Sequence, residues 1–436
     1  MSTTTVQPNS PVGYGELVRR NVNFRWLWCG QIISLLGDWF NLIASASLVA
    51  QLSGSGVAIG GLFVVRMLAP FLVSPIAGVV ADRYNRKYIL ILTDITRALT
   101  VFCFLFIREA SQIWLLYVLT SVQLGISGFF FPTRNAILPD IVLRGELGTA
   151  NAISSTTWSV MLALGAAIGG LVSGTWGIYP AFSVDALTFF VSALFIARIK
   201  YDPPAGIDAS EKTVGAALKQ YVDGLRYLRN HVDVLVITLH KAANALLISS
   251  GFQVLQVAIS KNVFVMGQGG GISLGLMFGV AGIGTGIGPI LARRFTGDRD
   301  SPLRYTIVLS YVIMGLGMLL VAPLLSFPVV LLGILLRGVG GGINWVFSTQ
   351  LLLQLAPNQV RGRIFATEFA FFTLMSAASA AVVGGVLDAS VSISVVAWWM
   401  GGLVLIPATL WTLWLVVGTR TEPASEEIDL TVAKSS

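Results

Sequence analysis

The charged residues of this chain lie almost entirely in the gaps between long apolar runs. These runs recur from residue 24 to residue 418. Each holds roughly 20 residues, the length that a helix needs to cross a hydrocarbon layer of ~30 Å. Charged residues make up 11% of the chain and hydrophobic residues 55%, whereas about a quarter of the residues of a soluble protein are charged. The pattern therefore predicts a protein that crosses a membrane many times.

The apolar runs favour helices over the strands of a membrane barrel. Barrel strands alternate polar and apolar residues, and these runs do not. A helix satisfies its backbone hydrogen bonds within its own segment, as a hydrocarbon environment requires. We therefore expect an all-α membrane protein with twelve transmembrane helices. The predicted spans are residues 24–51, 57–80, 88–107, 112–131, 151–174, 178–198, 234–258, 272–292, 303–322, 328–350, 364–387 and 395–418.

The longest hydrophilic stretch lies between the sixth and seventh spans and divides the chain into halves. Residues 132–170 resemble residues 348–385, because each stretch has a polar elbow followed by a glycine-rich helix. Such internal duplication is typical of secondary transporters, which bind substrate near the midplane between the repeats. The predicted division is a leader at 1–23, an N-terminal six-helix bundle at 24–199, a linker at 200–233, a C-terminal six-helix bundle at 234–418 and a tail at 419–436.

The positive charges indicate how the chain is oriented in the membrane. With the N-terminus in the cytoplasm, 22 Lys and Arg residues fall in cytoplasmic segments. Only Arg108 and Lys261 fall on the opposite side, and the remaining four lie within or at the edges of spans. Cytoplasmic segments of membrane proteins carry such an excess. We therefore expect a plasma-membrane protein with both termini cytoplasmic. This topology explains the net charge of +7, so no nucleic-acid partner is expected.

The sequence offers little for a metal, a cofactor or an enzymatic reaction. Cys29 and Cys103 lie in apolar spans, and His231 and His240 are too few for a ligand cluster. No Walker A string occurs, so ATP-driven transport by this chain alone is not expected. Residues 282–288 are rich in glycine, but they lie inside an apolar span without the preceding strand of a dinucleotide site. We expect no metal site, no cofactor and no enzyme activity.

One string between the second and third spans carries a specific pattern. It begins at Gly78, continues with Asp82 and Arg83, and ends with Arg86 and Lys87. A small residue lets two helices approach closely, and the tight loop after it presents an acid and three bases at the membrane surface. The string resembles motif A of the major facilitator superfamily, G-x-x-x-D-R-x-x-R-R/K. The alternative interpretation is an ordinary basic loop on the cytoplasmic side.

Further stretches extend this resemblance over nearly the whole chain. Residues 66–78, 132–139 and 181–189 look like the branch of the superfamily that holds the enterobactin exporters and the macrolide efflux proteins. The resemblance implies two pseudo-symmetric six-helix bundles, with the first, fourth, seventh and tenth spans lining a central cavity. It also implies that the bundles rock to open this cavity to each side in turn. The resemblance says little about the substrate, because that branch handles unrelated cargo.

The same resemblance implies a charged gate at the cytoplasmic ends of the bundles, which would close that side in the outward-facing state. Asp94 and Arg97 lie at i and i+3 near the cytoplasmic end of the third span, and we expect them to join the motif. The predicted gate consists of Gly78, Asp82, Arg83, Arg86, Lys87, Asp94, Arg97, Arg134 and Glu368.

Ionisable residues inside spans are candidates for function, because burying a charge in hydrocarbon is costly. Asp38 lies deep in the first span, and Arg66 lies at a comparable depth in the second. We expect them to pair, either as a proton-coupling site or as a static ion pair. Asp185 in the sixth span is interpreted as structural. His240 and Lys241, at the start of the seventh span, are interpreted as interfacial.

Three further residues are candidates for contact with cargo. Arg337 lies in the tenth span before several glycines, and it could bind an anionic group, relay charge or snorkel to the interface. Phe130 in the fourth span and Trp345 in the tenth are candidates for lining a cavity. Ordinary helix packing is the alternative for both aromatic residues.

Four glycines in the fifth span form a second pattern. Gly165, Gly169, Gly170 and Gly174 resemble the antiporter-associated motif C, except that its proline is absent. The alternative is close helix packing, which glycines permit in membranes.

Together these patterns predict a secondary transporter that exports an amphipathic small molecule, such as a drug, a macrolide or a siderophore. The proton gradient is the expected energy source and a monomer the expected state. The first alternative is a lipid mover of the same fold, acting on lysophospholipid or glycolipid. The second is a sensor that transports nothing.

Overall fold

The computed structural model describes residues 13–201, 214–297, 299–356 and 358–418. All regular elements in these ranges are helices, and 12 helical segments are long and apolar enough to cross a membrane. The predicted all-α membrane fold is therefore confirmed. Residues 1–12, 202–213 and 419–436, which belong to the predicted leader, linker and tail, lie outside the described ranges.

The helices follow one another with short connections. The first half contains α1 (Tyr14–Arg20), α2 (Val22–Ser53), α3 (Gly56–Arg83), α4 (Arg86–Cys103), η1 (Phe104–Phe106), η2 (Ala110–Gln112), α5 (Ile113–Ile141), η3 (Arg144–Glu146), α6 (Leu147–Thr175) and α7 (Ile178–Ala197). The second half contains α8 (Val214–Asn230), α9 (Val232–Asn244), η4 (Ala245–Ser249), α10 (Ser250–Asn262), η5 (Gln268–Gly270), α11 (Gly271–Thr296), α12 (Asp300–Val321), α13 (Phe327–Leu355), α14 (Asn358–Asp388), α15 (Ile393–Leu403) and α16 (Leu405–Gly418).

Several helices continue beyond the apolar runs that predict them. Helix α5 extends from the predicted end at residue 131 to Ile141, through two prolines and polar residues. The hydroxyl of Thr133 donates to the carbonyl of Phe129 at 2.7 Å, which satisfies that polar side chain within the helix. Hydropathy therefore marks the part of a helix that faces hydrocarbon, and the helix itself is longer.

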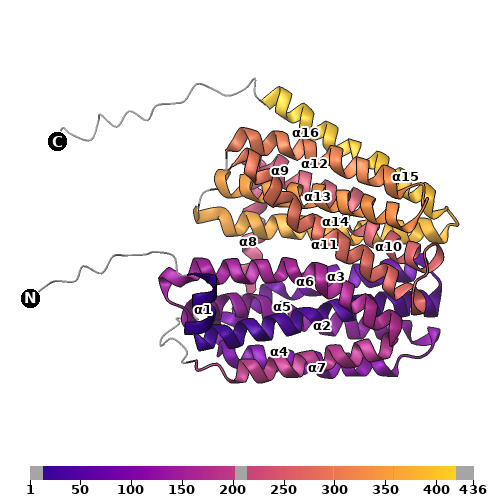
Figure 1. Cartoon of the computed structure of the whole chain (residues 1–436). Coiled ribbons are helices and arrows are strands. Elements are labelled where there is room, and N and C mark those ends of the chain that lie inside the picture. Colours follow the sequence, from indigo (N-terminus) through magenta and orange to yellow (C-terminus); the bar gives the residue numbers. More distant parts are fainter. Residues whose placement is uncertain (1–12, 202–213, 298, 357, 419–436) are drawn as a thin grey trace, which may run out of the picture.

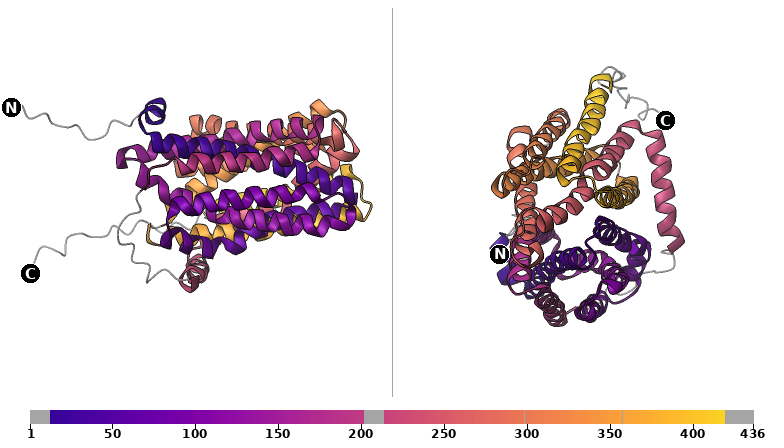
Figure 2. Two further views of the ribbon diagram at one scale, coloured as in Figure 1. Left: turned by 90° about the horizontal axis from the view of Figure 1, so that it is seen from below. Right: turned by 90° about the vertical axis from the view of Figure 1, so that its right-hand side faces the viewer.

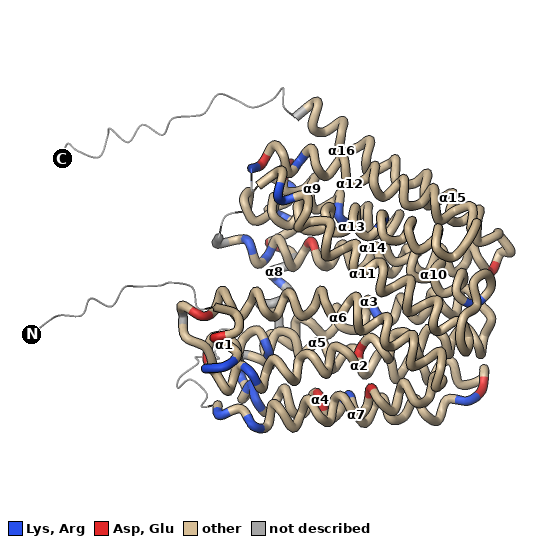
Figure 3. The backbone as a smooth tube through the Cα atoms, in the orientation of Figure 1, with Lys and Arg blue, Asp and Glu red and all other residues tan. Residues whose placement is uncertain are grey.

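Helices α2–α7 form one bundle and α9–α16 form the other, and the two lie side by side along their length (Figures 1 and 2). Helix α8 lies at the side of the bundles and contacts α3 and α14. Both described chain ends lie at one end of the molecule, which we call the proximal end; the opposite end is the distal end. Lys and Arg gather at the proximal end (Figure 3).

The two bundles share one apolar core in their distal halves. This core includes Phe182 of the first bundle and Phe252 of the second, whereas each bundle has its own apolar core toward the proximal end. The distal contact is close because glycines meet there: a Cβ added to Gly170 would lie 2.4 Å from the Cα of Gly275. The bundles are thus held together distally.

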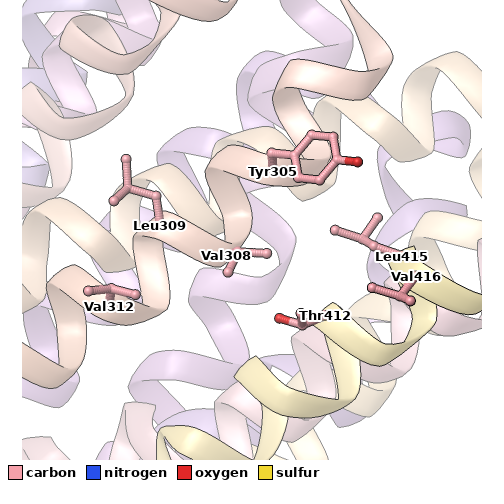
Figure 4. A pocket seen from close by; sticks show the side chains of 7 residues that line it. All are labelled: Tyr305, Val308, Leu309, Val312, Thr412, Leu415 and Val416. Carbon is pink, nitrogen blue, oxygen red and sulfur yellow. The ribbon is translucent and has the colours of Figure 1, made fainter.

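Three grooves in the described part of the chain are each formed within a single bundle. One, of about 610 Å³, lies between α12 and α16, where Tyr305, Leu309 and Thr412 line it (Figure 4). A second, of about 600 Å³, lies near α1 and the proximal ends of the N-terminal bundle, and a third, of about 550 Å³, is lined by residues of α3, α4 and α5. Because each groove is formed within one bundle, none of the three lies between the two bundles.

Candidate functional site

An ion pair lies deep inside the N-terminal bundle. Nη2 of Arg97 on α4 lies 2.6 Å from Oδ1 of Asp38 on α2. The Arg97 side chain is 2% exposed and the Asp38 side chain 26%. The prediction that Asp38 pairs with Arg66 is therefore wrong. The sequence shows the depth of a residue along its helix, but it does not show which helix face points to which neighbour.

Arg97 also contacts a second carboxylate and two aromatic rings. Its Nη1 lies 3.3 Å from Oδ1 of Asp94, and the hydroxyl of Ser192 donates to Oδ2 of Asp94 at 2.6 Å. The guanidinium lies 3.9 Å from the ring centre of Phe189 and 5.6 Å from that of Phe130. Asp94 and Arg97 thus belong to the bundle core, and the prediction that they join the cytoplasmic gate is wrong.

Phe130 and the next residue, Phe131, both line a small cavity beside the ion pair. Phe130 is 5% exposed and packs against Arg97, whereas Phe131 is 47% exposed. Successive residues of a helix point about 100° apart, which explains why the two neighbouring rings differ in exposure.

Two further charged residues complete this buried cluster. Nη1 of Arg66 on α3 and both carboxyl oxygens of Asp185 on α7 are buried without a hydrogen-bond partner among the described residues. Asp185 has no exposed surface. Sequence analysis assigned Asp185 a structural role, although its position within an apolar span was a signal that it could belong to the site.

A small cavity with both charged and apolar walls lies beside the ion pair. It has a volume of about 10 Å³, which holds about one water molecule, and its lining includes Asp38, Arg97, Arg134, Phe130 and Phe131. Nη2 of Arg134 donates to Oε1 of Gln31 at 2.7 Å and to the hydroxyl of Ser154. Arg134 is therefore held inside the bundle between α2 and α6, and it does not form part of a surface gate as predicted.

The motif A residues form contacts at the proximal end. Nη1 of Arg86 lies 2.6 Å from Oδ2 of Asp140 at the end of α5, and Nζ of Lys87 donates to the carbonyl of Ile199 at 2.7 Å. The hydroxyl of Tyr201 donates to Oδ2 of Asp140 at 3.0 Å. Burial and the neighbouring Asp140 carboxylate raise the pKa of Tyr201 to about 12, so this hydroxyl stays protonated at neutral pH. Sequence analysis missed Asp140.

The rest of the predicted gate is less closely packed. A Cβ added to Gly78 would meet no atom within 4 Å, so the close helix approach expected there is absent in this structure. Arg83 is exposed at the end of α3. The side chain of Asp82 lies outside the described part of the chain.

A second ion pair lies inside the C-terminal bundle. Lys241 on α9 pairs with Glu368 on α14, and its Nζ donates to the hydroxyl of Thr349 at 2.8 Å. Nζ also lies 4.0 Å from the ring centre of Trp345 on α13. The pair is buried, with 3% and 6% of its side chains exposed. The predictions of an interfacial Lys241 and of Glu368 in the gate are therefore wrong.

His240, beside this pair, is also buried. Its Nδ1 lies 2.8 Å from the hydroxyl of Tyr311, and its ring lies against Trp411. The interfacial location predicted for His240 is thus wrong, because the polar start of the seventh span packs against α12 and α16. Trp345 keeps 43% of its surface exposed, and its place in the lining of a cavity stays a prediction.

Arg337 is held by the backbone of the seventh span. Its Nη2 donates to the carbonyl of Ile248 at 2.6 Å, and its guanidinium lies 4.0 Å from the ring centre of Phe252. Ile248 belongs to the π-helical turn η4, and such turns interrupt the regular hydrogen-bond ladder of a helix. Arg337 therefore ties α13 to this irregular turn.

The glycines of the fifth span provide close packing. A Cβ on Gly165 would lie 2.8 Å from Trp39, and one on Gly169 would lie 2.9 Å from Phe40, both on α2. A Cβ on Gly174 would lie 2.5 Å from the side chain of Ile272 on α11. With Gly170 these residues let α6 contact one helix of each bundle, which supports the packing interpretation.

The site as a whole joins buried charges to an aromatic surface. The N-terminal bundle holds Asp38, Asp94, Asp185, Arg66 and Arg97 in its core. A low-polarity surrounding strengthens the ion pair between Asp38 and Arg97. Within the described residues, no group of acids, histidines and cysteines could hold a metal ion.

Comparison with known proteins agrees with the fold. The model of the Major Facilitator Superfamily matches residues 27–380 and again residues 272–434. The chain is 29% identical to the uncharacterized MFS-type transporter YfiS of Bacillus subtilis (strain 168) over 407 residues, which cover 91% of this chain and 94% of YfiS. It is 27% identical to multidrug resistance protein MdtG of Salmonella paratyphi C (strain RKS4594) over 390 residues, covering 86% and 89%.

A solved structure shows the same architecture. The crystal structure of the nucleoside transporter NupG superposes with a TM-score of 0.70 at 14% sequence identity, and the match covers 90% of this chain and 99% of that one. Such a likeness at low identity concerns the fold alone. The family match extends over most of the sequence, so the chain belongs to the Major Facilitator Superfamily and is a multi-pass membrane transporter of a small molecule, not an enzyme.

Proposed function

We propose that this transporter exports an amphipathic small molecule in exchange for protons. The observation that carries the proposal is the Asp38–Arg97 ion pair, which joins two helices deep within the N-terminal bundle. A carboxylate in the membrane is costly unless it is paired or protonated, so gaining a proton would release Asp38 from Arg97. That change links proton binding to the salt bridge that joins α2 to α4.

The positive charges support the expected orientation of the protein in the membrane. The excess of Lys and Arg at the proximal end (Figure 3) supports a cytoplasmic location for that end and for both termini. The close glycine contacts and the shared core then lie on the outer side. On this orientation the two bundles pack closely against each other on the outer side.

Exposed aromatic side chains support an amphipathic cargo. Trp345 on α13 and Phe131 on α5 keep 43% and 47% of their surface exposed. Lys241, beside Trp345, supplies a buried positive charge. An apolar surface with a few charged groups suits a molecule that has both characters. The name of the relative MdtG, a multidrug resistance protein, agrees with export of drug-like molecules.

Transport into everted membrane vesicles tests this proposal. Vesicles that contain the protein are supplied with a panel of drugs, macrolides and siderophores, with and without an acidic lumen. We expect at least one compound to accumulate in the lumen only when the pH gradient is present, and a protonophore to abolish this accumulation. Accumulation that is unaffected by the gradient and the protonophore would contradict proton coupling.

A further inference from the structure

One acid in the N-terminal bundle, Asp185, has no base paired with it among the described residues. Asp185 on α7 has no exposed surface, and neither of its carboxyl oxygens has a hydrogen bond within the described residues. The charged groups close enough to act on it are Asp38 of α2, Arg66 of α3 and Arg97 of α4.

The backbone places this acid against α2. A Cβ added to Gly37 would lie 2.4 Å from Oδ1 of Asp185 and 2.0 Å from the hydroxyl oxygen of Thr188. Only a glycine lets α2 approach α7 this closely at the residue before Asp38. Asn41, one helical turn further along α2, is fully buried, and its Nδ2 has no hydrogen-bond partner. Unpartnered polar atoms thus come from both helices.

None of the nearby bases pairs with Asp185. Arg97 pairs with both Asp38 and Asp94, and Nη1 of Arg66 has no hydrogen bond within the described residues. Arg134, which lines the cavity beside Asp38 and Arg97, is held by hydrogen bonds to Gln31 and Ser154. A carboxylate that is buried in a membrane protein without a paired base is costly, and one bound proton would remove its charge.

We propose that Asp185 carries this proton in the described conformation and exchanges it with Asp38 during transport. The Asp185 carboxyl group gives up its proton, and the Asp38 carboxylate receives it, leaving the contact with Arg97. Asp185 becomes a carboxylate opposite Arg66, while Asp38, whose side chain is 26% exposed, releases the proton to water. One proton moves and no other bond changes. This inference deepens the proposed function and rests on it.

Infrared spectroscopy of the purified protein in lipid nanodiscs tests the assignment. At neutral pH the wild-type protein should show the C=O stretching band of a protonated carboxyl group, and labelling with ¹³C-aspartate should shift it. Asp185→Asn should remove the band, and Asp185→Glu, which keeps an acid if the first variant does not fold, should move its frequency. Asp300→Asn, which alters an exposed acid on α12, should leave it unchanged. A band that is absent from the wild-type protein, or unchanged in the Asp185 variants, would overturn the proposal.

Transport measurements separate this inference from the proposed function. If Asp185 holds the proton, Asp185→Asn should lose accumulation driven by the pH gradient and keep the exchange of labelled for unlabelled cargo. Gradient-driven accumulation by Asp185→Asn at the wild-type level would overturn the role of Asp185 and leave proton-coupled export intact. A wild-type protein that ignores the gradient but keeps the aspartate band would instead contradict proton-coupled export.

Discussion

The two bundles differ in the partners that their buried charged side chains have. In the N-terminal bundle Arg97 is shared by two carboxylates, while Arg66 and Asp185 have atoms without partners. In the C-terminal bundle Lys241 has its own carboxylate, Glu368, and Arg337 donates to a backbone carbonyl. One half of the chain thus buries a carboxyl group without a paired base, Asp185, and the other half buries a carboxylate that has a base of its own, Glu368.

This difference suggests that the two halves have different roles in transport. A proton changes the energy most where a buried carboxyl group has no paired base, because the low-polarity interior screens its charge weakly. The C-terminal pair lies instead beside Trp345, which is 43% exposed. We therefore expect proton coupling to depend on the N-terminal cluster and cargo preference to depend on the C-terminal pair.

The largest effect on stability should come from Arg97→Gln. This change leaves Asp94, which has no exposed surface, with the hydroxyl of Ser192 as its remaining described partner. Removing one partner of a buried ion pair costs about 3–5 kcal/mol. We expect a clearly lower melting temperature in detergent, which the additional change Asp94→Asn should partly restore. An unchanged melting temperature of the single variant would contradict the proposed sharing of Arg97.

A smaller effect is expected from Glu368→Gln. Glutamine keeps a hydrogen-bond acceptor for Lys241, which also retains the hydroxyl of Thr349 and the ring of Trp345. A hydrogen bond to a charged group contributes about 1.5–3 kcal/mol. We expect altered cargo affinity, measured by concentration dependence of uptake into vesicles, and an unchanged response to the pH gradient. Loss of the response to the pH gradient would contradict the assignment of proton coupling to the N-terminal bundle.

The smallest effect is expected from Arg337→Lys. Lysine keeps the positive charge and a donor for the carbonyl of Ile248, but it loses the planar group that lies over Phe252. Such a stacked contact contributes about 1 kcal/mol. The melting temperature should fall slightly, while affinity and gradient response stay at wild-type levels. A strong loss of transport by this folded variant would show that Arg337 contacts cargo or relays charge.

Hydropathy predicted the twelve helices, because a membrane span is defined by length and apolarity along the chain. It did not predict the partner of Asp38. Arg66 and Arg97 both lie within spans, and which of them contacts Asp38 depends on the direction in which each side chain points from its own helix. Glu368 and Lys241 meet only after two distant spans pack together, so their pairing had no local signal.

The most direct test of proton coupling through Asp38 measures how much cargo accumulates in vesicles under a fixed pH gradient. The vesicles contain the wild-type protein, Asp38→Asn or Glu368→Gln. Our account predicts that Asp38→Asn equilibrates cargo without accumulating it, because its uncharged amide cannot take up the transported proton. It also predicts that Glu368→Gln accumulates cargo in proportion to the gradient, as the wild-type protein does. Gradient-driven accumulation by Asp38→Asn at the wild-type level would contradict the account.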